Sequence, residues 1–295
     1  MDMRKLWRYD VLKDGSAYLR CYKGEETDVI VPARIGNRPV HTIGAFALSP
    51  QNEVVPYDQQ LTNEHITNVT ICDGIRTIRQ FAFLKCKSLQ SVAMTDSVAT
   101  IENSAFAQCT SLETLTLSAG LRQIGDSAFE NSKLREVALP EGLEELGEKV
   151  FCDCKQLCSV KLPGSLRRIG DFAFGWTPIT SIEIPEGVES IGESVFRMCT
   201  VLQEVKLPKS LKKLGNASFY GCDQLKLVQL PWGITEIGEE AFTACYSLER
   251  LYVPETVEQI GKYAFGTCPN LTIYAPGGSV AEQYAKENNI PFIAQ

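Results

Sequence analysis

The sequence predicts a solenoid, in which short β-strands and tight helical turns repeat and stack on one another. A phenylalanine recurs nine times at intervals of 22 or 23 residues. Ile or Leu stands five residues before each of them, and Cys stands three residues after seven of the nine. A unit of this length buries its apolar face only by stacking on its neighbours. The recurring residues are Phe83, Phe106, Phe129, Phe151, Phe174, Phe196, Phe219, Phe242 and Phe265.

Each unit also contains two extended segments. Val205-Lys206-Leu207 alternates apolar and polar side chains, which predicts a short strand, and Pro208 ends its pairing because proline has no N–H. Leu211–Gly215 predicts a second short extended piece that turns at its glycine. The Ala-Phe-x-x-Cys stretch between such segments predicts a tight helical turn. Stacked units would lie about 4.8 Å apart, as neighbouring strands do.

The cysteines follow the same repeat. Ser132 and Thr177 replace the Cys in the two units that are followed by a 22-residue step, and one residue is missing after each. A thiol that fills space in the longer turn explains this pattern. Stacked cysteines would have nearly parallel Cα–Cβ bonds, which disfavours disulfides, and buried thiols behave as small apolar groups. We therefore expect the ladder to be core packing in a reducing compartment.

The repeat Ile-Gly-x-x-Ala-Phe-x-x-Cys-x-x-Leu-x-x-Val-x-Leu-Pro resembles the BspA-like (Treponema-type) leucine-rich-repeat family over residues 9–295. This resemblance implies a leucine-rich-repeat solenoid of the α/β repeat class, wound as a curved superhelix. It also implies a binding function, often at bacterial or protist surfaces. It provides no catalytic residues to transfer to this chain.

The ends and one interruption set the expected organisation of a single continuous domain. A hairpin over Tyr9–Tyr22, turning at Asp14-Gly15, belongs to an N-terminal cap and first rung over residues 1–46. An inserted loop follows over 47–65, counted from Phe46 to Ile66, and serves either as plain surface or as a binding loop. The repeat solenoid covers 66–273, and a C-terminal cap covers 274–295. In that cap, Ser279-Val280-Ala281-Glu282 has capping-box spacing for a helix that ends near Asn288.

Composition narrows the partners and the location. The chain is 44% hydrophobic and 22% charged, and its net charge is −7. The acidic balance disfavours nucleic acid, which needs a basic surface. No apolar run reaches the roughly 20 residues of a spanning helix, so we expect no membrane insertion. Without a signal-peptide pattern we expect a cytoplasmic monomer, and a cell-surface or secreted protein is the alternative.

Residues that could carry chemistry are sparse, and we expect neither an enzyme nor a cofactor. The chain has two histidines, His41 and His65, and no nucleotide-binding fingerprint. Cys152, Cys154 and Cys158 are clustered, but no histidine lies nearby and their spacing fits no standard zinc site. Cys152 and Cys158 stand where other units carry exposed residues, so we expect both to be exposed.

Outward positions of the main strands form the predicted binding surface. In the C-terminal half these positions are richer in large and charged side chains, and Arg and aromatic residues are the usual interface anchors. We therefore predict a non-enzymatic scaffold that binds a protein, or alternatively a glycan, through this face. A surface adhesin and a structural or regulatory repeat without a dedicated ligand are the alternatives. The candidate residues are Lys161, Glu183, Glu204, Lys206, Leu227, Gln229, Trp232, Arg250 and Tyr252.

A second surface column lies on the shorter extended segments. From residue 144 to residue 236 its charges change sign from one unit to the next, which stabilises adjacent strands. We expect this column to be a solvated, stabilising surface. Its members are Glu144-Glu145, Arg167-Arg168, Glu189-Ser190, Lys212-Lys213, Thr235-Glu236 and Glu258-Gln259.

Overall fold

The computed structural model describes residues 3–51 and 63–295. The chain forms two compact units. The first unit contains Met1–Leu143 and Val150–Gln156, and the second contains Glu144–Lys149 and Leu157–Gln295. Part of the predicted 47–65 loop, residues 52–62, lies outside the described residues.

The first unit opens with helix α1 (Met3–Leu6) and the predicted hairpin, in which β1 and β2 pair antiparallel. Gly15 has φ 82° in its turn, a conformation that suits glycine. From there the chain alternates between two sheets, and strands β5 to β11 are parallel within their sheets. One sheet contains, in spatial order, β1 (Trp7–Val11), β2 (Ala17–Tyr22), β5 (Arg38–Ile43), β7 (Thr77–Ile78), β9 (Thr100–Ile101) and β11 (Gln123–Ile124), and β4 (Arg34–Ile35) pairs with β5. The other contains β3 (Asp28–Val31), β6 (Asn68–Ile71), β8 (Ser91–Met94) and β10 (Thr114–Thr116). Along the chain, η2 (Asn63–His65) precedes β6, and β12 (Glu136–Ala138), which is not part of this sheet, follows β10.

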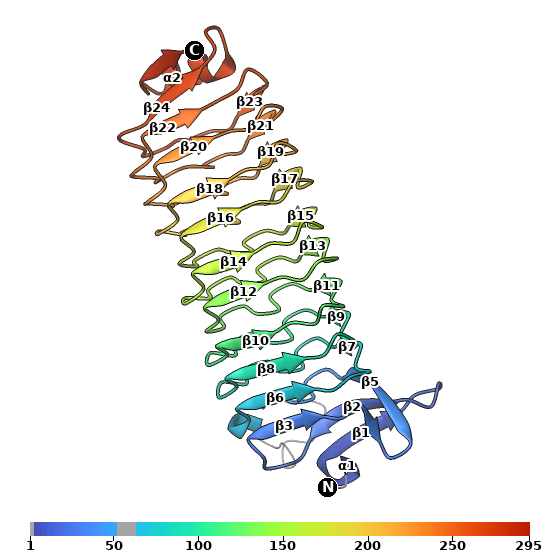
Figure 1. Cartoon of the computed structure of the whole chain (residues 1–295). Helices are drawn as coiled ribbons and strands as arrows, with labels where there is room; N and C mark the ends of the chain where they lie inside the picture. The colour runs from blue at the N-terminus through green and yellow to red at the C-terminus, as the bar shows by residue number, and fades with distance from the viewer. Residues whose placement is uncertain (1–2, 52–62) are drawn as a thin grey trace. The chain divides into compact units, whose positions relative to one another are not determined.

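The second unit repeats this plan with two columns of short strands (Figure 1). The shorter strands form one parallel sheet in the order β13 (Glu145–Leu146), β15 (Arg168–Ile169), β17 (Ser190–Ile191), β19 (Lys213–Leu214), β21 (Glu236–Ile237) and β23 (Gln259–Ile260). The longer strands are β14 (Ser159–Lys161), β16 (Ser181–Glu183), β18 (Glu204–Lys206), β20 (Leu227–Gln229), β22 (Arg250–Tyr252), β24 (Thr272–Ala275) and β25 (Phe292–Ala294). Helix α2 (Val280–Glu287) lies between β24 and β25.

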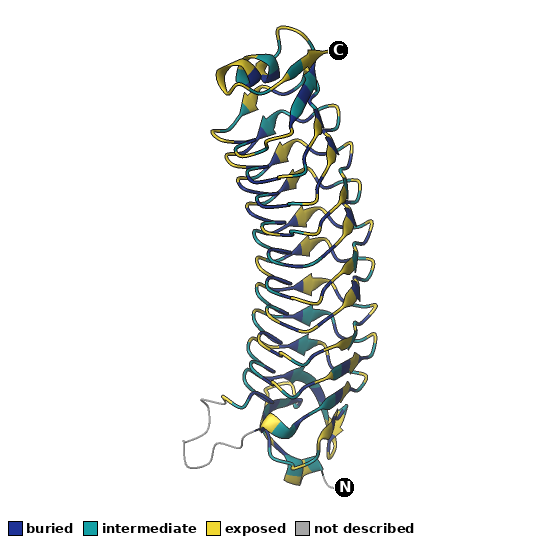
Figure 2. Ribbon diagram, turned by 90° about the vertical axis from the view of Figure 1, so that its left-hand side faces the viewer, coloured by how far each residue is buried: buried dark blue, intermediate teal, exposed yellow. Residues whose placement is uncertain are grey.

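Each rung buries the side chains that point between its two strands, as the dark residues along the rungs indicate (Figure 2). The repeated phenylalanines form a stack in each unit. In the first unit the ring centroids from Phe83 to Phe151 are 4.5, 5.3 and 5.6 Å apart. In the second unit, from Phe174 to Phe265, they are 5.7, 5.2, 5.2 and 5.9 Å apart. The predicted leucine-rich-repeat solenoid is therefore confirmed in both units.

The turn around each phenylalanine is built from short loops of helical hydrogen bonding that cannot continue as a helix. The Cys222 N–H donates to Phe219 O, and the Tyr220 N–H donates to Ala217 O, which is an i to i+3 pattern. Ala217 and Gly221 then have φ values of 51° and 70°, and this left-handed geometry ends each turn. The N–H groups of Ala217, Phe219 and Gly221 donate instead to carbonyl oxygens of the next rung.

The cysteine thiols do more than fill space, because each ladder thiol lies within hydrogen-bond range of a main-chain carbonyl in the preceding rung. The Cys222 thiol donates to Phe196 O at 3.2 Å, and the Cys245 thiol donates to Phe219 O at the same distance. Burial raises the pKa of Cys109 to about 12 and that of Cys154 to about 11. In one shortened turn, the Thr177 hydroxyl donates to Phe174 O at 2.6 Å within its own rung. Phe174 O therefore accepts two hydrogen bonds, because the Cys199 thiol of the next rung also donates to it at 3.2 Å.

Two expectations about individual residues were wrong. Leu48 N–H donates to Ala82 O, as Phe83 N–H does to Ala105 O one rung later, so Leu48 and not Phe46 occupies the ladder position. Phe46 instead stacks on Phe81 at 5.1 Å, and Ala47 and Leu48 belong to the first rung rather than to an insertion.

The second wrong expectation was that Cys152 and Cys158 are both exposed. Cys152 is buried, and Cys158 is exposed. Cys152 occupies the rung position of Ala107, which is 3% exposed, so a small side chain there is covered by the neighbouring turns.

The C-terminal cap follows its prediction closely. Ser279 caps α2, and its side chain accepts a hydrogen bond from the Glu282 N–H. The Glu282 carboxylate accepts from Gly278 N–H, one residue before the position that a capping box would use. Tyr284 packs edge-on against Phe265 at 5.3 Å, and β25 pairs with β24. Helix and strand together cover much of the last rung.

The charge column is also present in the second unit, with Glu145 opposite Arg168 and Lys213 opposite Glu236. The Lys213 amine lies 2.5 Å from the Glu236 carboxylate. Both side chains are well exposed, so the pair contributes no more than about 1 kcal/mol to stability.

Candidate functional site

The nine predicted surface residues all lie in the second unit. Leu227 and Trp232 have large apolar side chains that are 44% and 67% exposed. Tyr252 is half-buried, and the other six are exposed. The structure does not place the nine in one cluster, because seven divide between two grooves and the other two, Arg250 and Tyr252, lie on β22.

The larger groove lies between β18 and β20, which are neighbours in the column of longer strands (Figure 1). Its volume is about 680 Å³. It contains five of the predicted residues, Glu204, Lys206, Leu227, Gln229 and Trp232. We call this the β18–β20 groove, and its remaining walls are Val205, Leu207, Lys209, Leu230 and Pro231.

The β18–β20 groove coincides with an interruption in the hydrogen-bonded sheet. β16 pairs with β18 and β20 pairs with β22, each in parallel register, but the ladder does not continue from β18 to β20. Val205 is half-buried, whereas Val228, the inward residue of β20, is 1% exposed. The interruption therefore opens part of the apolar core to the surface.

The interruption also leaves main-chain groups facing the groove. On the other side of β20, Arg250 N–H donates to Lys226 O and Leu230 N–H donates to Tyr252 O. Alternate residues of a strand face opposite neighbours, so the peptide groups of Leu227 and Gln229 face β18. Among the described residues, no ladder bond joins them to β18. Peptide groups at an open strand edge favour a partner that can hydrogen-bond with them.

A smaller groove of about 520 Å³ lies at a second interruption, between β14 and β16. It contains the predicted residues Lys161 and Glu183. Val160 is half-buried there, as Val205 is in the larger groove. β16 follows the shortened turn at Thr177, which changes the length of chain between the two strands.

Charge is distributed along the β18–β20 groove rather than concentrated in it. Glu204 lies on β18, and Lys209 and Trp232 lie on the turns that follow the two strands. The Lys206 amine lies 2.5 Å from Glu183, and this hydrogen bond raises the pKa of Lys206. The groove therefore combines an apolar centre with charged groups of both signs at its rim.

Arg250 and Tyr252 lie on β22, outside both grooves. Tyr252 stacks on Tyr274 of β24 with a centroid distance of 4.9 Å. Sequence reasoning missed Val205, Leu230, Lys209 and Tyr274. Periodicity assigns the first two to the core, and nothing in the sequence marks the break that half-exposes Val205.

The groove offers binding groups rather than a recognisable catalytic arrangement. It contains a carboxylate, two amines and an indole, and both histidines of the chain belong to the first unit. Across residues 3–51 and 63–295, no group of three or more His, Cys, Asp or Glu side chains is placed to hold a metal ion. Within the same residues, no helix has the length and apolar character needed to cross a membrane.

Comparison with known proteins agrees with this architecture. The chain matches the BspA type leucine rich repeat region in six copies, over residues 57–177 and 167–284, and it belongs to this family. Comparison with curated proteins gave no match.

Two solved structures illustrate the similarity. The leucine rich repeat protein of T. pallidum is 28% identical, with a TM-score of 0.56 over 75% of this chain and 89% of its own. A leucine rich cell surface protein of Faecalibacterium prausnitzii A2-165 is 23% identical, with a TM-score of 0.55 over 95% of each chain.

Proposed function

We propose that this protein is a non-enzymatic interaction scaffold that binds a protein partner through the strand face of its second unit, centred on the β18–β20 groove. The observation that carries the proposal is the interrupted ladder. It half-exposes Val205 and leaves peptide groups of Leu227 and Gln229 without strand partners on that side. An extended segment of a protein supplies both apolar side chains and main-chain hydrogen bonds, so it matches these two features together.

Trp232 and Leu227 supply the expected anchors of such an interface. A few residues, most often Trp, Tyr and Arg, carry most of the binding energy in protein complexes, so Trp232 is the main anchor and Leu227 adds apolar contact beside it. Both side chains are exposed in the isolated chain and would become buried against a partner. Lys206, Lys209 and Glu204 would form the polar rim, which contributes specificity and association rate more than affinity.

The test is a double replacement, Leu227→Ser with Trp232→Ala. Tyr246→Ala is the matched control, because Tyr246 is 50% exposed and does not line the groove. A partner is first fixed by chemical cross-linking in the source cells, identified and purified. The double variant should then bind this partner at least about 30-fold more weakly, which corresponds to about 2 kcal/mol for a hot spot.

Three outcomes would contradict the proposal. Equal affinity of the double variant and Tyr246→Ala would place the interface elsewhere. Loss of binding after glycosidase treatment of the partner would make the ligand a glycan. No cross-linked partner, together with an unchanged cellular phenotype of the double variant, would favour a structural repeat without a dedicated ligand.

Location forms a separate part of the proposal. We propose a cytoplasmic protein, because no disulfide joins the cysteines of the described residues and reduced thiols suit a reducing compartment. The second candidate is a cell-surface adhesin, because the F. prausnitzii structure is described as a cell surface protein. Protease treatment of intact source cells distinguishes the two. Protection until the cells are lysed supports the first, and digestion without lysis supports the adhesin.

A further inference from the structure

The turns of the second unit are joined by a ladder of main-chain hydrogen bonds that runs toward the C-terminal end. Three alternate N–H groups of each turn donate to carbonyl oxygens of the next rung. In the turn of Phe242 these bonds join Glu240, Phe242 and Ala244 to Lys262, Ala264 and Gly266. The last rung has equivalent groups at Tyr263, Phe265 and Thr267, and no further rung follows to receive them.

Helix α2 replaces the missing rung only at the middle position. There the Tyr284 ring packs edge-on against Phe265. Burial raises the pKa of Tyr284, and the main-chain N–H groups of Phe265 and Ala264 lower it less strongly. Among the described residues, the N–H groups of Tyr263 and Thr267 make no hydrogen bond. Each ladder thiol donates to a carbonyl of the preceding rung, and the Cys268 thiol accordingly donates to Phe242 O. Phe265 O therefore has no thiol donor, because a cysteine of a further rung would have to supply it. The end of the ladder thus keeps both a free donor and a free acceptor.

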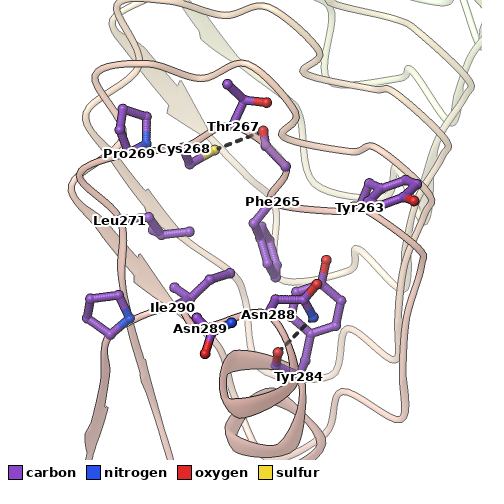
Figure 3. A pocket seen from close by; sticks show the side chains of 12 residues that line it. Tyr263, Phe265, Thr267, Cys268, Pro269, Leu271, Tyr284, Asn288, Asn289 and Ile290 are labelled. Carbon is purple, nitrogen blue, oxygen red and sulfur yellow. Dashed lines mark hydrogen bonds between the residues drawn. The ribbon is translucent and has the colours of Figure 1, made fainter.

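A pocket of about 340 Å³ opens beside these groups, between the last turn and the helix (Figure 3). Phe265, Leu271 and Ile290 provide apolar walls, and Asn288 and Asn289 border it from the end of α2. The Asn288 side chain donates to Tyr284 O within the helix. Asn289 has φ 54°, and its main-chain N–H donates to Lys286 O. Its side-chain amide makes no hydrogen bond to another of the described residues. The pocket therefore pairs an apolar interior with amide and main-chain groups at its edge.

We propose that this pocket is a second binding site, independent of the strand face, that takes an extended peptide segment through one apolar side chain and its adjoining peptide group. A peptide unit has a carbonyl oxygen for the Thr267 N–H and an N–H for Phe265 O. These are the two functions that a further rung would supply. The volume lies at the lower end of ligand pockets and suits one side chain rather than a large ligand.

The experiment uses the full chain, labelled with ¹⁵N, and two small probes. The first probe, N-acetyl-phenylalanine N-methylamide, has the complete peptide unit. The second, N-acetyl-phenylalanine methyl ester, lacks its C-terminal N–H. Titration with the amide should shift the Thr267 and Gly266 resonances saturably. The ester should bind about fivefold more weakly, as expected for one lost hydrogen bond.

Matched variants locate the site. Ile290→Trp fills the pocket and should weaken amide binding by about tenfold or more, since it displaces the apolar side chain of the probe. Ile293→Trp is its control, because Ile293 is 48% exposed and does not line the pocket. Asn289→Gly removes the side-chain amide at the edge of the pocket and should weaken binding of the amide probe. Because glycine tolerates the left-handed φ, this variant should keep the fold, and it tests the site even if Ile290→Trp unfolds.

Several results would overturn the proposal. The first is the absence of saturable shifts at Thr267 with the amide. Equal affinities for amide and ester would remove the peptide group from the recognition, and binding unaffected by both pocket variants would place the site elsewhere. Shifts of Thr267 that follow protein concentration without any probe would identify a second copy of the chain as the occupant.

Discussion

Replacing Phe196 by Ala tests the stacked core of the second unit. Phe196 is fully buried, and its ring lies 5.7 Å from Phe174 and 5.2 Å from Phe219. Removing such a side chain from a rigid core destabilises a protein by about 3–5 kcal/mol. Two aromatic contacts of about 0.5–1.5 kcal/mol each are lost with it, so we expect a value in the upper half of that range. Urea unfolding monitored by circular dichroism measures the free energy of unfolding.

The matched control is Phe196→Leu, because Leu48 occupies the same ladder position in the first rung of the other unit. This replacement keeps most of the volume and should destabilise by about 1.5 kcal/mol or less. A loss below about 1 kcal/mol for Phe196→Ala would refute the stacked core. Equal losses for Ala and Leu would show that the ring stacking, rather than the filled volume, determines stability.

Three further predictions concern the thiols, one hydroxyl and the cap. Stability should fall as pH rises above about 9 toward 12, because unfolded thiols ionise while the folded pKa values of Cys109 and Cys154 are raised to about 12 and about 11. Each such thiol contributes up to about 1.4 kcal/mol per pH unit, and Cys109→Ala should flatten urea midpoints measured from pH 8 to 10.5. Ser218→Ala should raise the free energy of unfolding by about 1 kcal/mol, because the Ser218 hydroxyl is buried and has no hydrogen-bond partner among the described residues; a clear loss of stability would contradict this. Deleting 279–295 should cause association visible in sedimentation velocity, because it exposes Phe265 and the last rung, and an equally stable monomer would argue against capping.

Local patterns in the sequence predicted much of the fold. The spacing of phenylalanines determines which residues stack, since each rung has nearly the same length. The hairpin at Gly15 and the helix capped by Ser279 also follow from short motifs, which depend on neighbouring residues alone. Thiol burial was predictable for the same reason, although the hydrogen bond from Cys222 to Phe196 O depends on the distance between rungs.

The candidate site was less predictable, because it depends on relations between rungs. The outward positions of β18 and β20 were correctly identified as exposed. The groove arises from the interrupted ladder between β18 and β20, which depends on the distance between these strands. The rungs on both sides have equal length, so the repeat spacing does not reveal the interruption. The repeat pattern assigns Phe46 to the phenylalanine ladder, but in the structure Leu48 occupies that position in the first rung. The pocket beside Thr267 depends on how α2 meets the last rung, which no repeat pattern encodes.

The central claim is that the β18–β20 groove binds a protein partner, and site-specific photo-crosslinking tests it most directly. A benzophenone amino acid replaces Gln229, an exposed residue of β20 that lines the groove, or Glu239, an exposed residue of the same unit that lies outside it. The account predicts one defined protein adduct from position 229 in source cells. Excess unlabelled wild-type chain should suppress this adduct, whereas the Leu227→Ser, Trp232→Ala variant should not. No adduct at 229, or equal adducts from both positions, would contradict the claim.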